Sequence, residues 1–212
     1  MARNRTQNYD DQKRAIQRGA AELFATRGYL GTSMNDVAEG CGLSKPSLYH
    51  YFRDKDELLA SIAEEHVARL AQLVKSVETD TSLKPLDRLA ALITRFLTEY
   101  SEARNAHRVL TEDVKFLPQE ARERILHFER LVVSGFADAI SVHRPDVREA
   151  ELHKAVAMLL FGMLNWMFTW MRADGKLTHA TIAPLVCDLF FHGLPGVRIP
   201  LAEEKSHSGR PD

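Results

Sequence analysis

TSMNDVAEGCGLSKPSLYHYFRDK (residues 32–55) is the stretch that decides the fold, and it predicts two short helices joined by a tight turn. Ser33 can cap the first helix, and Asp36 stands three residues later in the capping-box position. Gly42 suits the end of that helix, because glycine takes the left-handed conformation without strain. Ser44 can cap the second helix. The pattern therefore predicts a helix-turn-helix.

The second of these helices should present a polar face to its surroundings. Leu48 and Phe52 are four residues apart, so both side chains can pack inward. The outward positions then include Tyr49 and His50, and a helix-turn-helix places such a face in the DNA major groove. We expect DNA contacts from Ser33, Ser44, Lys45, Pro46, Ser47, Tyr49, His50 and Lys55. The lysines and the tyrosine hydroxyl suit phosphates, whereas Ser47 and His50 suit base edges. The alternative is an exposed face without a ligand.

Residues 9–59 resemble the DNA-binding domain of the TetR family of transcriptional regulators. The resemblance is carried by AAELFATRGY at 20–29, TSMNDVA at 32–38 and GLSKPSLYHYF at 42–52, followed by Lys55. It implies a regulator that dimerises through its C-terminal part, and a lysine at position 55 that meets a DNA phosphate.

Composition and charge set broad limits. The chain has 212 residues, 45% of them hydrophobic and 27% charged, and a net charge of −1. Residues 1–56 carry +2 and the remainder −3, which is compatible with a sequence-specific binder because such proteins need only a few well-placed cations. We expect Cys41 and Cys187 to be free thiols. The N-terminus has no apolar secretory segment, so we expect a cytoplasmic protein.

Apolar residues recur at helical spacing along the whole chain, and no stretch alternates like a strand. We expect an all-α fold of about nine helices. Three domain-level segments follow: a helix-turn-helix domain at 1–56 with a flexible N-terminal arm over 1–9, a helical effector-binding and dimerisation bundle at 57–200, and a disordered tail at 201–212. Outside the helix-turn-helix, helices are expected at 10–27, 54–77, 85–103, 105–117, 119–142, 155–171 and 179–194. The helix at 54–77 would link the two domains.

The stretch AVAMLLFGMLNWMFTWM (155–171) is apolar on nearly every side. It is shorter than the about 20 apolar residues that a membrane span needs, and Asn165 and Thr169 interrupt it. A helix in a water-soluble protein that is apolar all round must be covered all round. We therefore expect 155–171 and 179–194 to pair with their copies in a homodimer.

The same helices contain candidate ligand-binding residues. Rings, methionines and an amide suit an apolar ligand with a polar end, and the candidates are Phe96, Tyr100, Phe128, Met158, Gly162, Asn165, Trp166 and Thr169. Ordinary packing is the alternative for each. Residues 164–175 also resemble a branch of the TetR family whose members respond to acyl-CoA thioesters. The expected effector is therefore an acyl-CoA or an apolar acid. An acidic head group can meet Arg104, Arg108 or Arg124, although a surface position is the alternative.

No pattern indicates catalysis, a cofactor or a metal. His107, Asp113, His127 and His153 lack metal-ligand spacing, and the chain has no HExxH. The expected function is a ligand-responsive DNA-binding regulator, most simply a repressor on a palindromic operator. The alternatives are a helical-bundle enzyme, for which no nucleophile elbow or phosphate loop is present, and an architectural DNA-binding protein without an effector.

Overall fold

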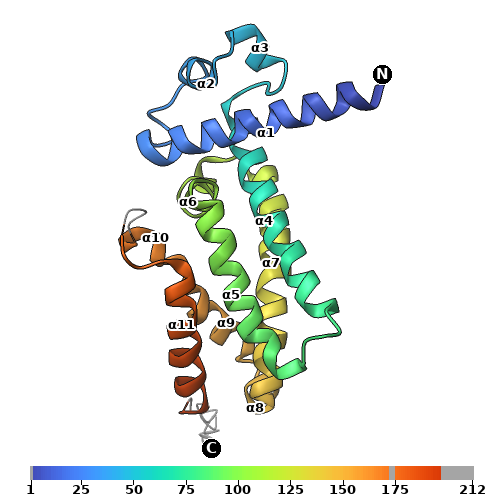
Figure 1. Ribbon diagram of the computed structural model, residues 1–212, viewed down its shortest axis with the longest axis vertical. Helices are drawn as coiled ribbons and strands as arrows, with labels where there is room; N and C mark the ends of the chain where they lie inside the picture. Colours follow the sequence, from blue (N-terminus) through green and yellow to red (C-terminus); the bar gives the residue numbers. More distant parts are fainter. Residues whose placement is uncertain (1, 172–174, 197–212) are drawn as a thin grey trace, which may run out of the picture.

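The computed structural model describes residues 2–171 and 175–196, and all regular structure in these ranges is helical (Figure 1). It comprises three short 3₁₀ helices, η1 (Pro85–Asp87), η2 (Val114–Phe116) and η3 (Leu194–Gly196), and eleven α-helices: α1 (Ala2–Arg27), α2 (Met34–Gly40), α3 (Lys45–Tyr49), α4 (Lys55–Thr79), α5 (Arg88–Glu102), α6 (Arg104–Glu112), α7 (Gln119–His143), α8 (Pro145–Glu149), α9 (His153–Asn165), α10 (Met167–Trp170) and α11 (His179–Gly193). The all-α prediction is confirmed. The short helices α8 and α10 raise the number above the nine expected.

The helix-turn-helix forms through the caps that the sequence predicted. The Ser33 hydroxyl accepts from the backbone N–H of Asp36 at 3.2 Å, and the Asp36 carboxylate accepts from the backbone N–H of Ser33 at 2.7 Å. The Ser44 hydroxyl accepts from the backbone N–H of Ser47 at 3.3 Å. Gly42 has φ +66°, the left-handed conformation expected after α2. These bonds define where α2 and α3 each begin.

The first helix is longer than predicted. The sequence predicted a helix from residue 10 and an arm over 1–9, but α1 begins at Ala2. No glycine or proline interrupts residues 2–18, so nothing in the chain stops the helix there. The ring of Tyr9 stacks on that of Tyr51 with centroids 4.8 Å apart, which supports the N-terminal part of α1 against the end of the helix-turn-helix.

Long helices below the helix-turn-helix form the second part of the molecule (Figure 1). In it, α4 packs against α5, α6 and α7, while α9 packs against α7 and α11 against α5. Their buried side chains form one cluster that continues into α1, α2 and α3. The division proposed between residues 56 and 57 thus falls in the first turn of α4, which both parts share. The predicted tail at 201–212 lies outside the described residues.

Contacts between the two parts extend beyond α4. Helix α1 packs against α6, and the Gln17 side-chain amide donates to the Ser61 hydroxyl at 2.8 Å. The ring of Phe116 stacks on that of Tyr29 with centroids 5.6 Å apart. A displacement of α6 would therefore change its packing against α1 as well as against α4.

The apolar stretch 155–171 is not one helix. It divides into α9 and α10 at Trp166, whose backbone carbonyl accepts from the N–H of Thr169 at 3.2 Å and from its hydroxyl at 2.6 Å; such side-chain bonds compete with the helical pattern. Apolar side chains of α9 and α11 point away from the chain's own core, including Leu159, Met163, Leu185 and Leu189. Within the part of the chain that is described, no helix is both long and apolar enough to cross a membrane.

Candidate functional site

Helix α3 presents the polar face that the sequence predicted. Leu48 and Phe52 are fully buried, so the side chains on the other side of the helix point outward. Ser33, Ser44, Lys45, Pro46, Ser47, Tyr49 and His50 are all exposed. The ammonium nitrogen of Lys45 lies 5.9 Å from the centre of the Tyr49 ring. One side of α3 therefore carries a cation, hydroxyls and rings that are exposed in the described part of the chain.

Tyr9 is a neighbour of this face that the sequence reasoning missed. Its ring lies edge-on to His50 with centroids 6.0 Å apart, in addition to its stack on Tyr51. The tyrosine comes from the part of α1 that was expected to be an irregular arm, so no spacing argument connected it to α3. It extends the aromatic surface beside His50.

Lys55 has partners within the protein that its sequence position did not reveal. Its ammonium group donates to the backbone carbonyls of Tyr29 and Thr32, both at 2.9 Å, and lies 4.2 Å from the centre of the Tyr29 ring. An ammonium has three N–H donors, so one remains for a phosphate. Burial and a hydrogen bond to the Asp56 carboxylate raise the pKa of the Tyr29 hydroxyl, so the tyrosine remains a neutral donor that ties the 29–32 loop to α4.

A cavity of about 540 Å³, here called the central cavity, opens between α4, α6, α7 and α9. Five of the eight predicted ligand residues line it: Tyr100, Met158, Gly162, Asn165 and Trp166. The Tyr100 hydroxyl donates to the Asn165 side-chain carbonyl at 3.0 Å, so the half-buried amide already has a protein partner. The lining also includes Val67, Leu70, His107, Leu110, Thr111, Glu129, Val132, Val133 and Phe161.

Three predicted ligand residues do not line this cavity. Phe96 is fully buried and packs edge-on against Phe136 with ring centroids 4.8 Å apart. Phe128 lies half-buried beside a separate surface hollow near His127, and Thr169 is exposed with its hydroxyl bonded to Trp166. Residue type alone did not distinguish packed rings from lining rings, because both are apolar residues at helical spacing.

Two buried histidines join the cavity to α4. His66 on α4 and His107 on α6 share a hydrogen bond of 3.2 Å between Nε2 and Nδ1. Burial lowers the pKa of each to about 3, with His107 and Arg69 adding to the effect at His66, and His179 adding to it at His107. His66 was absent from the sequence candidates. His107 was weighed only as a metal ligand, and the described residues contain no group of three or more His, Cys, Asp or Glu placed to hold a metal.

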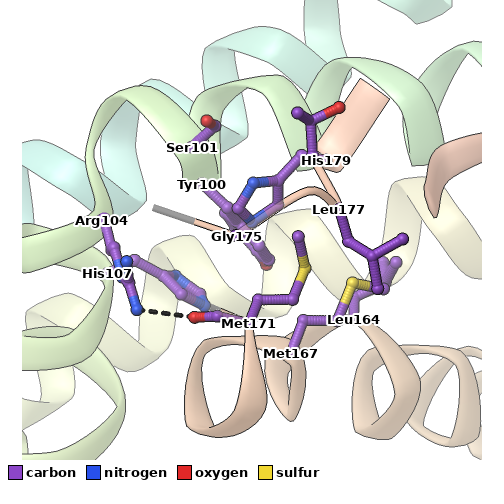
Figure 2. Close-up of a pocket in the computed structure, with 11 residues that line it drawn as sticks. Tyr100, Ser101, Arg104, His107, Leu164, Met167, Met171, Gly175, Leu177 and His179 are labelled. Carbon is purple, nitrogen blue, oxygen red and sulfur yellow. Dashed lines mark hydrogen bonds between the residues drawn. The ribbon is translucent and has the colours of Figure 1, made fainter. Parts of the chain in front are cut away.

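A second cavity, of about 250 Å³, lies beside the first and is called the Arg104 cavity (Figure 2). It is lined by Tyr100, Ser101, Arg104, His107, Leu164, Met167, Met171, Gly175, Leu177, Thr178 and His179. Of the three arginines considered for an acidic head group, Arg104 lines this cavity, and Arg108 and Arg124 do not. Arg108 and Arg124 are exposed and pair with Glu112 and Glu64.

Family models match both parts of the chain. Residues 16–62 match the model of bacterial regulatory proteins of the tetR family, and residues 82–194 match the tetracycline repressor-like C-terminal domain. The two matches correspond to the helix-turn-helix region and to the helices that enclose the two cavities.

Solved structures and curated relatives agree with these matches. A TetR-family transcriptional regulator from Bordetella parapertussis is 32% identical, with a TM-score of 0.80 over 88% of this chain and 97% of its own. AibR, solved with isovaleryl coenzyme A and operator DNA, is 28% identical, with a TM-score of 0.71 over 84% of this chain and 98% of its own.

The transcriptional repressor KstR2 of Rhodococcus jostii is 27% identical over 82% of this chain and 87% of its own length. Four curated relatives, from Bacillus subtilis, Mycolicibacterium smegmatis and Mycobacterium tuberculosis, are matched over less than half of their own length. The Bordetella protein is described as a transcriptional regulator and KstR2 as a transcriptional repressor. The chain belongs to the TetR family of transcriptional regulators.

Proposed function

We propose that this regulator is a homodimeric, effector-responsive repressor that binds a palindromic operator through α3. The observation that carries the proposal is the uncovered face of α3, held in place by the Ser33 and Ser44 caps. Lys45, Tyr49 and the third N–H of Lys55 would contact phosphates, and Ser47 and His50 would read bases. Ser33, Ser44 and Pro46 would line the same surface. Such binding would take place in the cytoplasm.

The outward apolar face of α9 and α11 supports the dimer. Leu159 and Leu189 are 72% and 68% exposed, and Leu185 is 52% exposed. Large apolar side chains gathered on one face are typical of an interface. A two-fold dimer would place two copies of α3 on two half-sites about one DNA turn apart, which is why we propose a palindromic operator.

The central cavity is the proposed effector site, with Tyr100, Met158, Gly162, Asn165 and Trp166 as contacts. Its lining is apolar apart from a few polar groups, which suits an apolar ligand with a hydrogen-bonding end. An acyl-CoA-type effector is supported by the AibR complex with isovaleryl coenzyme A. The cavity touches α4 and α6, so a ligand that prefers one arrangement of these helices would shift the DNA-bound population. Phe96, Phe128 and Thr169 are left out of this site.

The proposal is tested by selecting duplexes from a random DNA library on the full-length protein. We expect an inverted repeat to be enriched, and light scattering to give the mass of a dimer at micromolar concentration. A monomer, or a selected site without two-fold symmetry, would reject the proposal. A thermal-shift screen of acyl-CoAs and apolar acids then identifies ligands of the folded state, and hits are expected to release the selected duplex.

A further inference from the structure

The Arg104 cavity differs from the central cavity in the sign of its charged groups. Its described lining residues include Arg104, His179 and the hydroxyl groups of Ser101 and Thr178, but no aspartate or glutamate. The central cavity has the reverse composition, since Glu129 lines it without any lysine or arginine among the described lining residues. The two neighbouring cavities should therefore prefer different ligands.

Arg104 is placed to receive an anion. The side chain is half-buried, and one guanidinium N–H donates to the backbone carbonyl of Met171 at 2.8 Å, the bond that is dashed in Figure 2. A guanidinium has five N–H donors, and no carboxylate lies within salt-bridge distance of Arg104 in the described part of the chain. Arg108, four residues later on the same helix, instead forms an ion pair with Glu112, with 2.9 Å between the guanidinium nitrogen and the carboxylate oxygen.

The rest of the lining is mainly apolar, and the cavity itself is small. Leu164, Met167, Met171 and Leu177 provide the apolar surface. A cavity of about 150 Å³ can hold benzene, with its six carbon atoms, so the 250 Å³ here would hold a molecule of about ten non-hydrogen atoms by proportion. A coenzyme A moiety is far larger than this space.

From this arrangement we infer that the Arg104 cavity is a binding site for a small monocarboxylate with a short apolar chain. The carboxylate accepts hydrogen bonds from Arg104 and from the Ser101 or Thr178 hydroxyl, and the chain lies against Met167, Met171 and Leu177. Charge-assisted bonds of this kind are stronger than neutral ones. The site is separate from the proposed effector site, although Tyr100 and His107 line both cavities.

The inference is tested by calorimetric titration of the full-length protein at pH 7 with hexanoate and with hexanamide. These two ligands have the same carbon chain and differ in charge. We expect hexanoate to bind at least about tenfold more tightly than hexanamide, which corresponds to about 1.4 kcal/mol. Arg104→Gln should abolish this preference. The matched control Arg108→Gln should retain it, because Arg108 lies on the surface.

Two further variants keep the test decisive if Arg104→Gln does not fold. Leu177→Trp fills the cavity from a half-exposed position and should prevent hexanoate binding, whereas Leu86→Trp, the same change at an exposed position on η1, should leave it unchanged. Equal affinities of the wild-type protein for hexanoate and hexanamide would overturn the inference, as would unchanged binding by Leu177→Trp. None of these titrations includes DNA, so their outcome is independent of operator binding.

Discussion

The ring of Tyr100 stacks on the ring of His107 with centroids 3.6 Å apart, and this pair forms a wall shared by the two cavities. His107 in turn shares a hydrogen bond with His66 on α4. A ligand in the central cavity can contact α4 directly at Val67 and Leu70, and a ligand in the Arg104 cavity is connected to α4 through His107 and His66. Helix α6, which carries His107, packs against both α4 and α1. A displacement of α6 would therefore reach the DNA-binding part through α4 and through α1.

Removing side chains from the face of α3 should weaken DNA binding while leaving the fold intact. We expect Lys45→Ala and Tyr49→Ala each to reduce affinity for a selected duplex by about tenfold, in line with the about 1–3 kcal/mol of a good contact. Lys45→Ala should also remove one phosphate contact, so the slope of the logarithm of affinity against the logarithm of salt concentration should become smaller by about 1. Band-shift titrations at several salt concentrations measure both effects. Lys75→Ala, an exposed lysine near the far end of α4, is the control, and equal losses in all three variants would refute the assignment.

Lys55→Ala should lower stability as well as DNA affinity. The ammonium group satisfies two backbone carbonyls of the 29–32 loop, and hydrogen bonds from charged groups contribute about 1.5–3 kcal/mol. We expect the free energy of unfolding, measured by urea denaturation, to fall by about this amount. A loss no greater than that of Lys75→Ala would mean that the two carbonyl contacts contribute little.

Gly42→Ala should destabilise the helix-turn-helix through the backbone alone. A Cβ at this position would meet no atom within 4 Å, but φ is +66°, and the left-handed conformation costs an alanine about 1–2 kcal/mol. Asparagine tolerates this conformation better, so Gly42→Asn should lose less stability. Thermal unfolding of the two variants checks the order, and an alanine variant as stable as the wild type would show that the turn can change conformation.

Stability should fall as the pH is lowered from 7 to 5. The folded-state pKa of about 3 for His66 and His107 lies below the unfolded value of about 6.5. The unfolded chain therefore binds more protons in this range, and each histidine costs about 2 kcal/mol at pH 5. The groups facing the pair are Arg69, Glu99 and His179.

Urea denaturation of His66→Gln at both pH values measures this contribution. The variant should show about half of the wild-type loss, because one of the two buried histidines is gone. The exposed His127→Gln variant should behave as the wild type does. A wild-type stability that does not change between pH 7 and 5 would contradict the assignment of two neutral histidines.

A charge on the outward face of α9 should break the proposed dimer. Leu159→Glu places a carboxylate at a position that is 72% exposed in the single chain, so the monomer should remain folded, while burial of the charge at an interface would be costly. Light scattering is expected to give a monomer and band shifts a large loss of DNA affinity. Leu86→Glu, on exposed η1, is the matched control; a dimeric Leu159→Glu protein would exclude this face.

Local signals predicted much of this architecture. The caps at Ser33 and Ser44 and the left-handed Gly42 follow from short-range chemistry that the structure reproduces. The bounds of α4, α5, α7 and α11 were predicted within a few residues, as for α4 at Lys55–Thr79 against the predicted 54–77. The inward pair Leu48 and Phe52 also settled which face of α3 is exposed.

Long-range pairings were not accessible from the sequence. The His66–His107 bond joins residues 41 positions apart, and the Lys55 carbonyl contacts depend on how the 29–32 loop meets α4. Rings at helical spacing look alike whether they line a cavity, as Tyr100 does, or fill the core, as Phe96 does. The break between α9 and α10 at Trp166 was also missed, because apolar periodicity continues through it.

The central claim, that α3 reads DNA as one of a symmetric pair, is tested most directly by hydroxyl-radical footprinting on the selected duplex. We predict two protected half-sites whose centres are about one helical turn apart, related by a two-fold axis, with protection lost in the Tyr49→Ala variant. A single protected half-site, or protection that Tyr49→Ala leaves unchanged, would contradict it.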